Sequence, residues 1–174
     1  MREFIQRMYQ AIQEGNVELF DDIEDGVKRG DIELSTEDIV PLCKLIITDS
    51  EYIEYSQIIE IARMTLWAVE KKDIKEGLEE LVKGLEEIYN EGKKDTWKNW
   101  YGSSYEEFID RYIGMTILRY KEEDMVLLGK SISKSCSTDF KSVMLKILKR
   151  TMAREEEKEG YIIKGKILED NIKL

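Results

Sequence analysis

The stretch from Glu18 to Gly26 has residue types that could hold a metal ion, because five carboxylates precede a glycine. A calcium loop of the EF-hand type needs oxygen ligands at alternating positions, a glycine at the sixth position and a bidentate glutamate at the twelfth. With Gly26 in the sixth position, the third and twelfth positions are Ile23 and Ile32, which carry no oxygen ligand. The spacing therefore excludes a calcium loop of this type.

The same stretch has the spacing of an amphipathic helix with an acidic outer face. At about 100° per residue, Phe20, Ile23 and Val27 share one apolar stripe. Asn16 is a residue type that commonly caps the start of a helix. We therefore predict a helix over residues 16–29 whose solvent side carries four carboxylates, which are Glu18, Asp21, Asp22 and Asp25.

Several kinds of catalytic site are excluded because the chain contains no histidine. Without histidine there is no Ser-His or Cys-His nucleophile pair, no zincin helix and no histidine-assisted di-iron bundle. The sequence also lacks a Walker-type phosphate loop and a G-x-G-x-x-G fingerprint. Cys43 and Cys136 follow no metal or redox spacing and are expected to be buried small side chains. Any chemistry would have to use carboxylates, lysines or tyrosines, and we expect no cofactor.

Two pairs of carboxylates at a spacing of three residues are the remaining catalytic candidates. Glu76 and Glu79 form the first pair, and Glu107 and Asp110 form the second. Their E-x-x-E and E-x-x-D spacing resembles that of the all-α, MazG-like nucleotide pyrophosphohydrolases. The resemblance implies that paired carboxylates on adjacent helices hold magnesium against a triphosphate and activate water. No cluster of basic phosphate contacts is evident beside either pair in the sequence.

The elements that must position these residues are predicted to be helices throughout. One proline and eleven glycines in 174 residues favour helices, and apolar residues recur with helical spacing along almost the whole chain. Helical pairs are expected to begin near residues 2, 35, 73 and 123. We predict one all-α domain over residues 1–174, built from stacked antiparallel helical hairpins as a HEAT-like α-solenoid or an irregular helical bundle.

Three local patterns refine this prediction. Gly77 and Gly84 lie one heptad apart beside the apolar seam of the helix that follows Asp73, which indicates close approach of a neighbouring helix. Residues 112–118 carry no charge and are expected to be deeply buried. The tail from residue 159 to 174 contains Gly160 and Gly165 and is predicted to form either a short β-hairpin or a last helix.

Acidic residues are concentrated in the first third of the chain. Residues 1–60 contain 15 acidic and 5 basic side chains, a net charge of −10 that equals the net charge of the whole chain. Arg29 is expected on the same helix face as Asp25, where it would neutralise part of this charge. A field of this sign repels nucleic acid and accelerates encounter with a cationic protein. A solvated acidic face is also common in soluble helical proteins, so both interpretations remain open.

A second surface candidate is the aromatic cluster around a loop, formed by Trp97, Trp100, Tyr101 and Tyr105. Large rigid rings are enriched among binding hot spots because they bury area at a low cost in entropy. They also close the ends of helical cores, which is the interpretation favoured for the two tryptophans. Tyr101 is the better candidate for a contact with a partner.

The chain as a whole is small, acidic and helical, and it carries no catalytic set. In this organisation it resembles the all-helical cytoplasmic immunity proteins of bacterial polymorphic toxin systems. The resemblance implies a protein that binds and masks a basic cognate toxin, often a nuclease. A helical adaptor or regulatory scaffold fits the same features. The N-terminal MREFIQRMYQ lacks the apolar segment of a signal peptide, and no apolar run approaches the roughly 18 residues that span a bilayer, so we expect a cytoplasmic protein without a membrane partner.

Overall fold

The computed structural model describes residues 1–48, 52–94 and 105–174, and these ranges contain helices and no strand. The predicted all-α fold is therefore confirmed. The helices are α1 (Glu3–Glu14), α2 (Val17–Arg29), the short 3-10 helix η1 (Thr36–Asp38), α3 (Ile39–Ile46), α4 (Tyr55–Val69), α5 (Ile74–Gly92), α6 (Tyr105–Arg119), α7 (Glu122–Ser135), α8 (Thr138–Arg154) and α9 (Glu159–Asn171).

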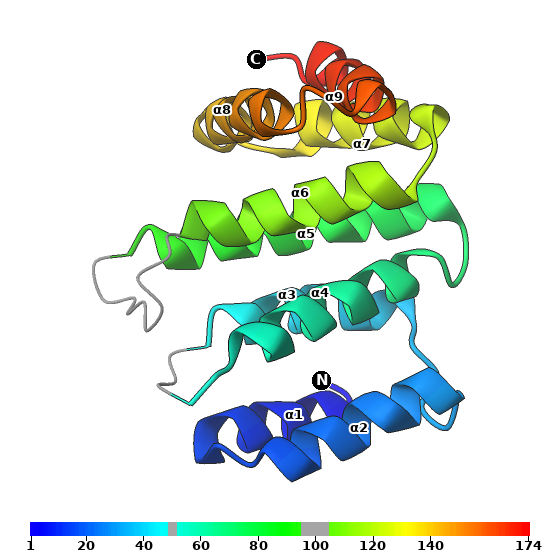
Figure 1. Ribbon diagram of the computed structural model, residues 1–174, viewed down its shortest axis with the longest axis vertical. Coiled ribbons are helices and arrows are strands. Elements are labelled where there is room, and N and C mark those ends of the chain that lie inside the picture. The colour runs from blue at the N-terminus through cyan, green and yellow to red at the C-terminus, as the bar shows by residue number, and fades with distance from the viewer. Residues whose placement is uncertain (49–51, 95–104) are drawn as a thin grey trace.

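The helices form layers that stack along one direction, as predicted for helical hairpins (Figure 1). The hairpins α1–α2, α3–α4 and α5–α6 each form one layer, and α7, α8 and α9 form the last. Each layer packs on its neighbours, which is how α-solenoids build a continuous core. The α1–α2 hairpin therefore lies at one end of the stack and the α7–α9 layer at the other.

The two sides of the stack differ in how tightly successive layers pack. On one side, α5 packs extensively against both α3 and α7. On the other side, α4 and α6 touch over a smaller area, and α2 and α4 scarcely touch. Two clefts lie on this side, one between α2 and α4 and one between α6 and α8.

The core runs through all layers and is dominated by isoleucine, leucine and methionine. Tyr112 lies fully buried at its centre, where its hydroxyl is 3.0 Å from the Thr65 hydroxyl. The prediction that residues 112–118 are buried holds for Ile113 and Ile117 but is wrong for Leu118, whose side chain is 63% exposed. A helix turns Leu118 away from the buried stripe because successive residues point about 100° apart.

The C-terminal tail forms α9, so the predicted β-hairpin is wrong and the alternative of a last helix is confirmed. The glycine at position 165 provides close packing and not a turn, because a Cβ there would lie 2.7 Å from the Met152 sulfur. Gly129 of α7 provides the same kind of contact, since a Cβ at that position would lie 3.0 Å from the Leu168 carbonyl oxygen. The glycines on α7 and α9 therefore allow α9 to pack closely against both α7 and α8. Within the described ranges, every helix is too short or too polar to cross a membrane.

Candidate functional site

Among the charged surfaces that the sequence predicts, the outer face of α2 has the most uniform sign of charge. Helix α2 lies in the layer at one end of the stack (Figure 1). The Asn16 side chain accepts a hydrogen bond from the Leu19 backbone N–H at 3.1 Å and so caps the helix, as predicted. Phe20 and Ile23 are buried against the rest of the protein. All four carboxylates of the predicted face are exposed, and together they are named the α2 acidic face here: Glu18, Asp21, Asp22 and Asp25.

None of these four carboxylates forms an ion pair with any described residue of the protein. The two cations of α2 are engaged elsewhere, because Lys28 pairs with Glu24 at 2.6 Å and Arg29 pairs with Asp31 at 3.0 Å. The expectation that Arg29 neutralises Asp25 is therefore not met. The reason is local: the chain turns at Gly30 and brings Asp31 beside the guanidinium. Neither cation of α2 therefore forms an ion pair with the α2 acidic face.

A second carboxylate group lies on the inner side of α2 and has a different environment. Glu24 is buried between α2 and α4, where Lys28 lies between it and Glu60. Burial raises the pKa of Glu24 above its ordinary value, and the nearby Glu60 adds to this effect while the hydrogen bond from Lys28 opposes it. The hydrogen bond to Glu24 in turn raises the pKa of Lys28. The hydrogen bond therefore stabilises the charged form of Lys28, whereas burial destabilises the charged form of Glu24.

Apolar side chains lie beside the α2 acidic face at the corner between α1 and α2. Val17 is 38% exposed and Tyr52 is 54% exposed. Tyr52 comes from the segment that precedes α4, yet it packs on Gly15, since a Cβ at Gly15 would lie 3.1 Å from Tyr52 Cγ. Sequence reasoning missed this contact because it joins residues far apart in the chain. Protein interfaces typically combine a core of large apolar side chains with a rim of polar and charged side chains.

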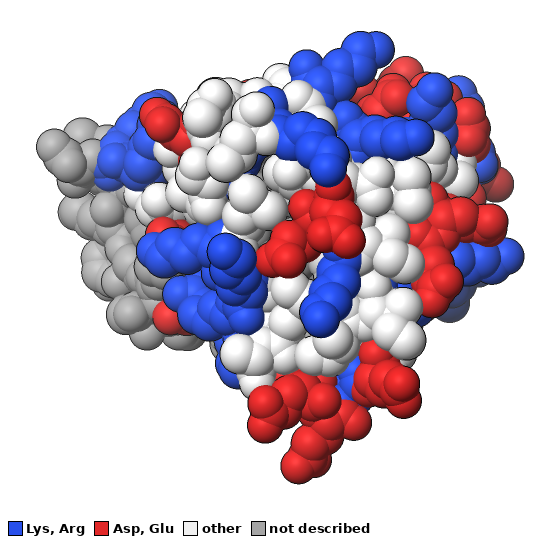
Figure 2. Space-filling model, turned by 90° about the horizontal axis from the view of Figure 1, so that it is seen from above, with Lys and Arg blue, Asp and Glu red and all other residues white. Residues whose placement is uncertain are grey.

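The opposite end of the stack does not carry charge of a single sign. Seen from that end, Lys and Arg side chains lie among Asp and Glu side chains over the last layer (Figure 2). The contrast with α2 agrees with the charge distribution along the sequence, in which residues 122–174 contain 10 acidic and 11 basic side chains. A cationic partner would therefore meet mixed charges on this surface and four carboxylates without ion pairs on the outer face of α2.

Of the predicted aromatic cluster, Trp97, Trp100 and Tyr101 lie outside the residues that the structure describes. Its fourth member, Tyr105, begins α6, where its ring lies 5.8 Å from the ring of Tyr89. The two interpretations of the cluster, as a plug for the core or as a contact with a partner, stay predictions.

The two carboxylate pairs of the alternative enzyme are placed on adjacent helices but at opposite ends of them. Helices α5 and α6 run in opposite directions, so that Gly92 at the end of α5 packs on Tyr105 at the start of α6. Glu76 and Glu79 therefore lie near the end of α6, and Glu107 and Asp110 lie near its start. In the described part of the chain, no three carboxylate or cysteine side chains come together as a group that could hold a metal ion.

Asp110 has a different set of partners from the one that a metal site requires. Its carboxylate accepts a hydrogen bond from the Thr151 hydroxyl at 2.5 Å and one from Arg154 Nη2 at 2.8 Å. Arg154 and Thr151 belong to α8, which is the next helix on this side of the stack. The sequence could not reveal these partners because they lie more than forty positions away.

Comparison of the chain with protein-family models, with curated proteins and with solved structures finds no match.

Proposed function

We propose that this protein binds a basic protein partner through the α2 acidic face. The observation that carries the proposal is that four exposed carboxylates share one helix face and form no ion pair within the described ranges. Like charges on successive helical turns repel one another and destabilise the helix by a few tenths of a kcal/mol per pair. A partner that brings lysine or arginine side chains to this face removes that repulsion.

Electrostatic attraction of this kind acts first on the rate of encounter. Uncompensated charge of one sign attracts a partner of opposite charge, and such steering raises association rates by about 10- to 1000-fold at low ionic strength. Exposed charges add less to the lifetime of a complex, because water screens them. The exposed Val17 and Tyr52 beside the face offer the apolar area that a lasting contact needs.

The partner class that fits this chemistry is a toxin domain whose substrate site is basic. A nuclease site must attract phosphate and is therefore cationic, so a protein with an acidic helix face can cover it. On this proposal the protein is a cytoplasmic immunity protein that masks a cognate toxin. This agrees with the organisational resemblance described from the sequence. The pyrophosphohydrolase alternative gains no comparable support, because its two carboxylate pairs lie at opposite ends of α5 and α6.

The test uses charge reversals that differ only in their position. Asp22→Lys/Asp25→Lys reverses two charges of the α2 acidic face, and Glu76→Lys/Glu79→Lys makes the same change of charge on the exposed surface of α5. Each tagged protein is used to capture partners from the native host, and the captured protein is identified, purified and titrated. We expect a basic protein that binds wild type and the α5 variant equally but binds the α2 variant at least about tenfold more weakly at low salt. An acidic partner, or equal binding by all three proteins, would contradict the proposal.

A further inference from the structure

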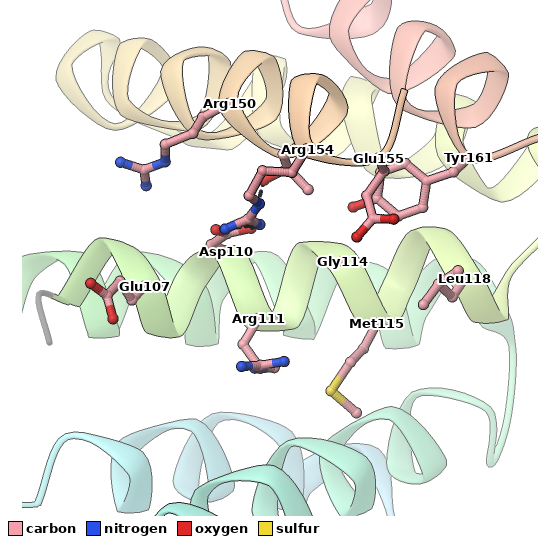
Figure 3. A pocket seen from close by; sticks show the side chains of 11 residues that line it. Glu107, Asp110, Arg111, Gly114, Met115, Leu118, Arg150, Arg154, Glu155 and Tyr161 are labelled. Carbon is pink, nitrogen blue, oxygen red and sulfur yellow. Dashed lines mark hydrogen bonds and ion pairs between the residues drawn. The ribbon is translucent and has the colours of Figure 1, made fainter. Parts of the chain in front are cut away.

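A cleft with a volume of about 480 Å³ lies between α6 and α8 and is bordered by the start of α9 (Figure 3). It lies on the side of the stack where successive layers pack less tightly. Its volume is within the range of pockets that hold small molecules, roughly 300–1000 Å³. The chemistry of its lining is separate from that of the α2 acidic face.

The guanidinium group of Arg154 forms one side of the cleft, and buried side chains hold it in place. Arg154 donates to Asp110, whose side chain is only 8% exposed, and Asp110 also accepts from the buried Thr151 hydroxyl. These bonds fix the orientation of the guanidinium on its Asp110 side. A guanidinium has five N–H donors, and within the described residues the remaining donors of Arg154 have no protein acceptor. They are available to a ligand in the cleft.

Two further arginines border the same opening. Arg150 lies one turn before Arg154 on α8, and its nearest carboxylate oxygen belongs to Glu106 at 3.7 Å. Arg111 lies on α6 with its guanidinium 5.3 Å from the centre of the Tyr55 ring, and it forms no ion pair with a described residue. Figure 3 shows Arg150 and Arg154 extending from α8 toward α6, whereas the Arg111 side chain extends from α6 toward α4. The two arginines of α8 therefore supply the cationic donors that face the cleft.

The Tyr161 hydroxyl faces the same space and is accessible from the cleft, although most of the side chain is buried. Tyr161 is 6% exposed, and no described residue forms a hydrogen bond with its hydroxyl. Burial raises the pKa of Tyr161 to about 12, helped by the nearby Asp110 and Glu155, so the hydroxyl keeps its proton at neutral pH. The hydroxyl is therefore free to donate a hydrogen bond to a ligand that enters the cleft.

Opposite Tyr161, the wall of the cleft is open because residue 114 is glycine. A Cβ at Gly114 would meet only the Tyr161 hydroxyl, at 3.5 Å. Met115 and the 63% exposed Leu118 continue this wall along α6 and offer an apolar surface. Among the carboxylates of the cleft, Asp110 is satisfied by its two donors and Glu155 pairs with Lys158 at 3.0 Å, which leaves Glu107 at the rim. The cleft therefore has more hydrogen-bond donors than unpaired protein acceptors.

We infer that this cleft binds a small phosphate ester. Its phosphate oxygens accept N–H groups from Arg150 and Arg154, and its organic part lies along Gly114, Met115 and Leu118. A carboxylate has two oxygens and is satisfied by one arginine fork, whereas a phosphate monoester presents three terminal oxygens and can engage guanidinium groups from different sides. Tyr161 supplies the donor that recognises a polar atom of the ester.

The test measures binding by calorimetry at low ionic strength and without divalent metal, with phenyl phosphate and adenosine monophosphate as probes. Benzoate has the same ring as phenyl phosphate with a carboxylate, and inorganic phosphate lacks an organic part. We expect at least one ester to bind at one site per chain with a Kd below about 1 mM, and both comparison ligands to bind at least about tenfold more weakly. If neither ester saturates the protein, or if benzoate binds as well as the esters, the inference is wrong.

Variants locate the site and separate it from general attraction of anions. Arg150→Gln removes a cleft donor, and Lys149→Gln removes the same charge from the neighbouring position of α8 outside the cleft lining. Gly114→Leu fills the cleft, and Tyr161→Phe removes only the unpaired hydroxyl. We expect Arg150→Gln and Gly114→Leu to weaken binding at least about tenfold, Tyr161→Phe to weaken it by a smaller factor without lowering the melting temperature, and Lys149→Gln to leave it unchanged. Equal losses in Arg150→Gln and Lys149→Gln, or full binding by Gly114→Leu, would overturn the assignment.

Discussion

Gly77 of α5 lies against the backbone of Val69 at the end of α4, so closely that a Cβ on residue 77 would overlap the Val69 carbonyl oxygen. A backbone atom cannot move aside as the end of a flexible side chain can. Glycine at this position therefore sets how closely the second and third layers approach each other, and hence how the later layers are placed. Gly84, one heptad further along α5, lies in the same way against the Cys43 side chain of α3.

Replacing Gly77 by alanine is expected to lower the free energy of unfolding by about 1–3 kcal/mol, because the added methyl group forces α4 and α5 apart. Urea denaturation followed by circular dichroism measures the effect. Gly160→Ala is the matched control, since no atom lies within 4 Å of a Cβ at that position of α9. It should leave stability unchanged or slightly raised. Equal stability of the two variants would mean that the contact between α4 and α5 adapts without cost.

Replacing Glu24 by glutamine is expected to raise stability at neutral pH relative to acid pH. The folded-state pKa of Glu24 lies above its ordinary value of 4.5, so the folded protein holds this proton to a higher pH than the unfolded chain does. Stability from Glu24 is therefore present at low pH and is lost as pH rises through the folded pKa. Glutamine mimics the protonated form at every pH. The difference in unfolding free energy between Glu24→Gln and wild type should grow from about pH 4 to about pH 7.

Glu79→Gln serves as the control for this pH dependence, because Glu79 is an exposed carboxylate on α5. The change of the stability difference with pH should be larger for Glu24→Gln than for Glu79→Gln. A Glu24→Gln protein that loses stability toward neutral pH would show that the ion pair with Lys28 outweighs the burial of the carboxylate.

Replacing Arg154 by methionine is expected to lower the free energy of unfolding by about 1–3 kcal/mol, because it leaves the buried Asp110 with one donor fewer. The arginine itself is 57% exposed, which limits the loss from the ion pair alone. Arg150→Met, one turn earlier on α8, loses only a 3.7 Å contact with Glu106 and should remain close to wild type. Guanidinium denaturation of the three proteins gives the comparison. Identical midpoints would show that Asp110 does not depend on Arg154.

No magnesium-dependent release of pyrophosphate is expected from any nucleoside triphosphate, because the two carboxylate pairs lie at opposite ends of α5 and α6. A coupled assay for pyrophosphate with purified protein measures this directly. Robust turnover that disappears in both Glu79→Gln and Asp110→Asn would contradict the binding-protein account and support the enzyme.

The sequence was sufficient to predict the helices that carry strong local signals. Asn16 caps α2, and Phe20 and Ile23 of its predicted apolar stripe are buried. These predictions succeed because a cap and an apolar stripe are set by residues within one or two turns of each other. The exposed position of Glu18, Asp21, Asp22 and Asp25 follows from the same periodicity.

The remaining features depend on contacts between distant parts of the chain. Gly165 suggests a turn when α9 is considered alone, and only the proximity of Met152 shows that it is a packing position. The α6–α8 cleft was not predicted from the sequence, because lining residues such as Arg111 and Arg154 are separated by more than forty residues. The spacing of Arg150 and Arg154 by four positions on one helix was a signal in the sequence, but it did not indicate which helix they would face.

The most direct test of the central claim is the rate at which the purified partner associates with the α2 acidic face at low and at high salt. Stopped-flow kinetics compares wild type, Asp22→Lys/Asp25→Lys and the control Glu76→Lys/Glu79→Lys, with circular dichroism to confirm equal helicity. The account predicts that the α2 reversal slows association at least about tenfold at low salt and flattens its salt dependence, while the α5 reversal has a much smaller effect. Association rates of the α2 variant that equal those of wild type at both salt concentrations would contradict it and reduce the face to a solvated helix surface.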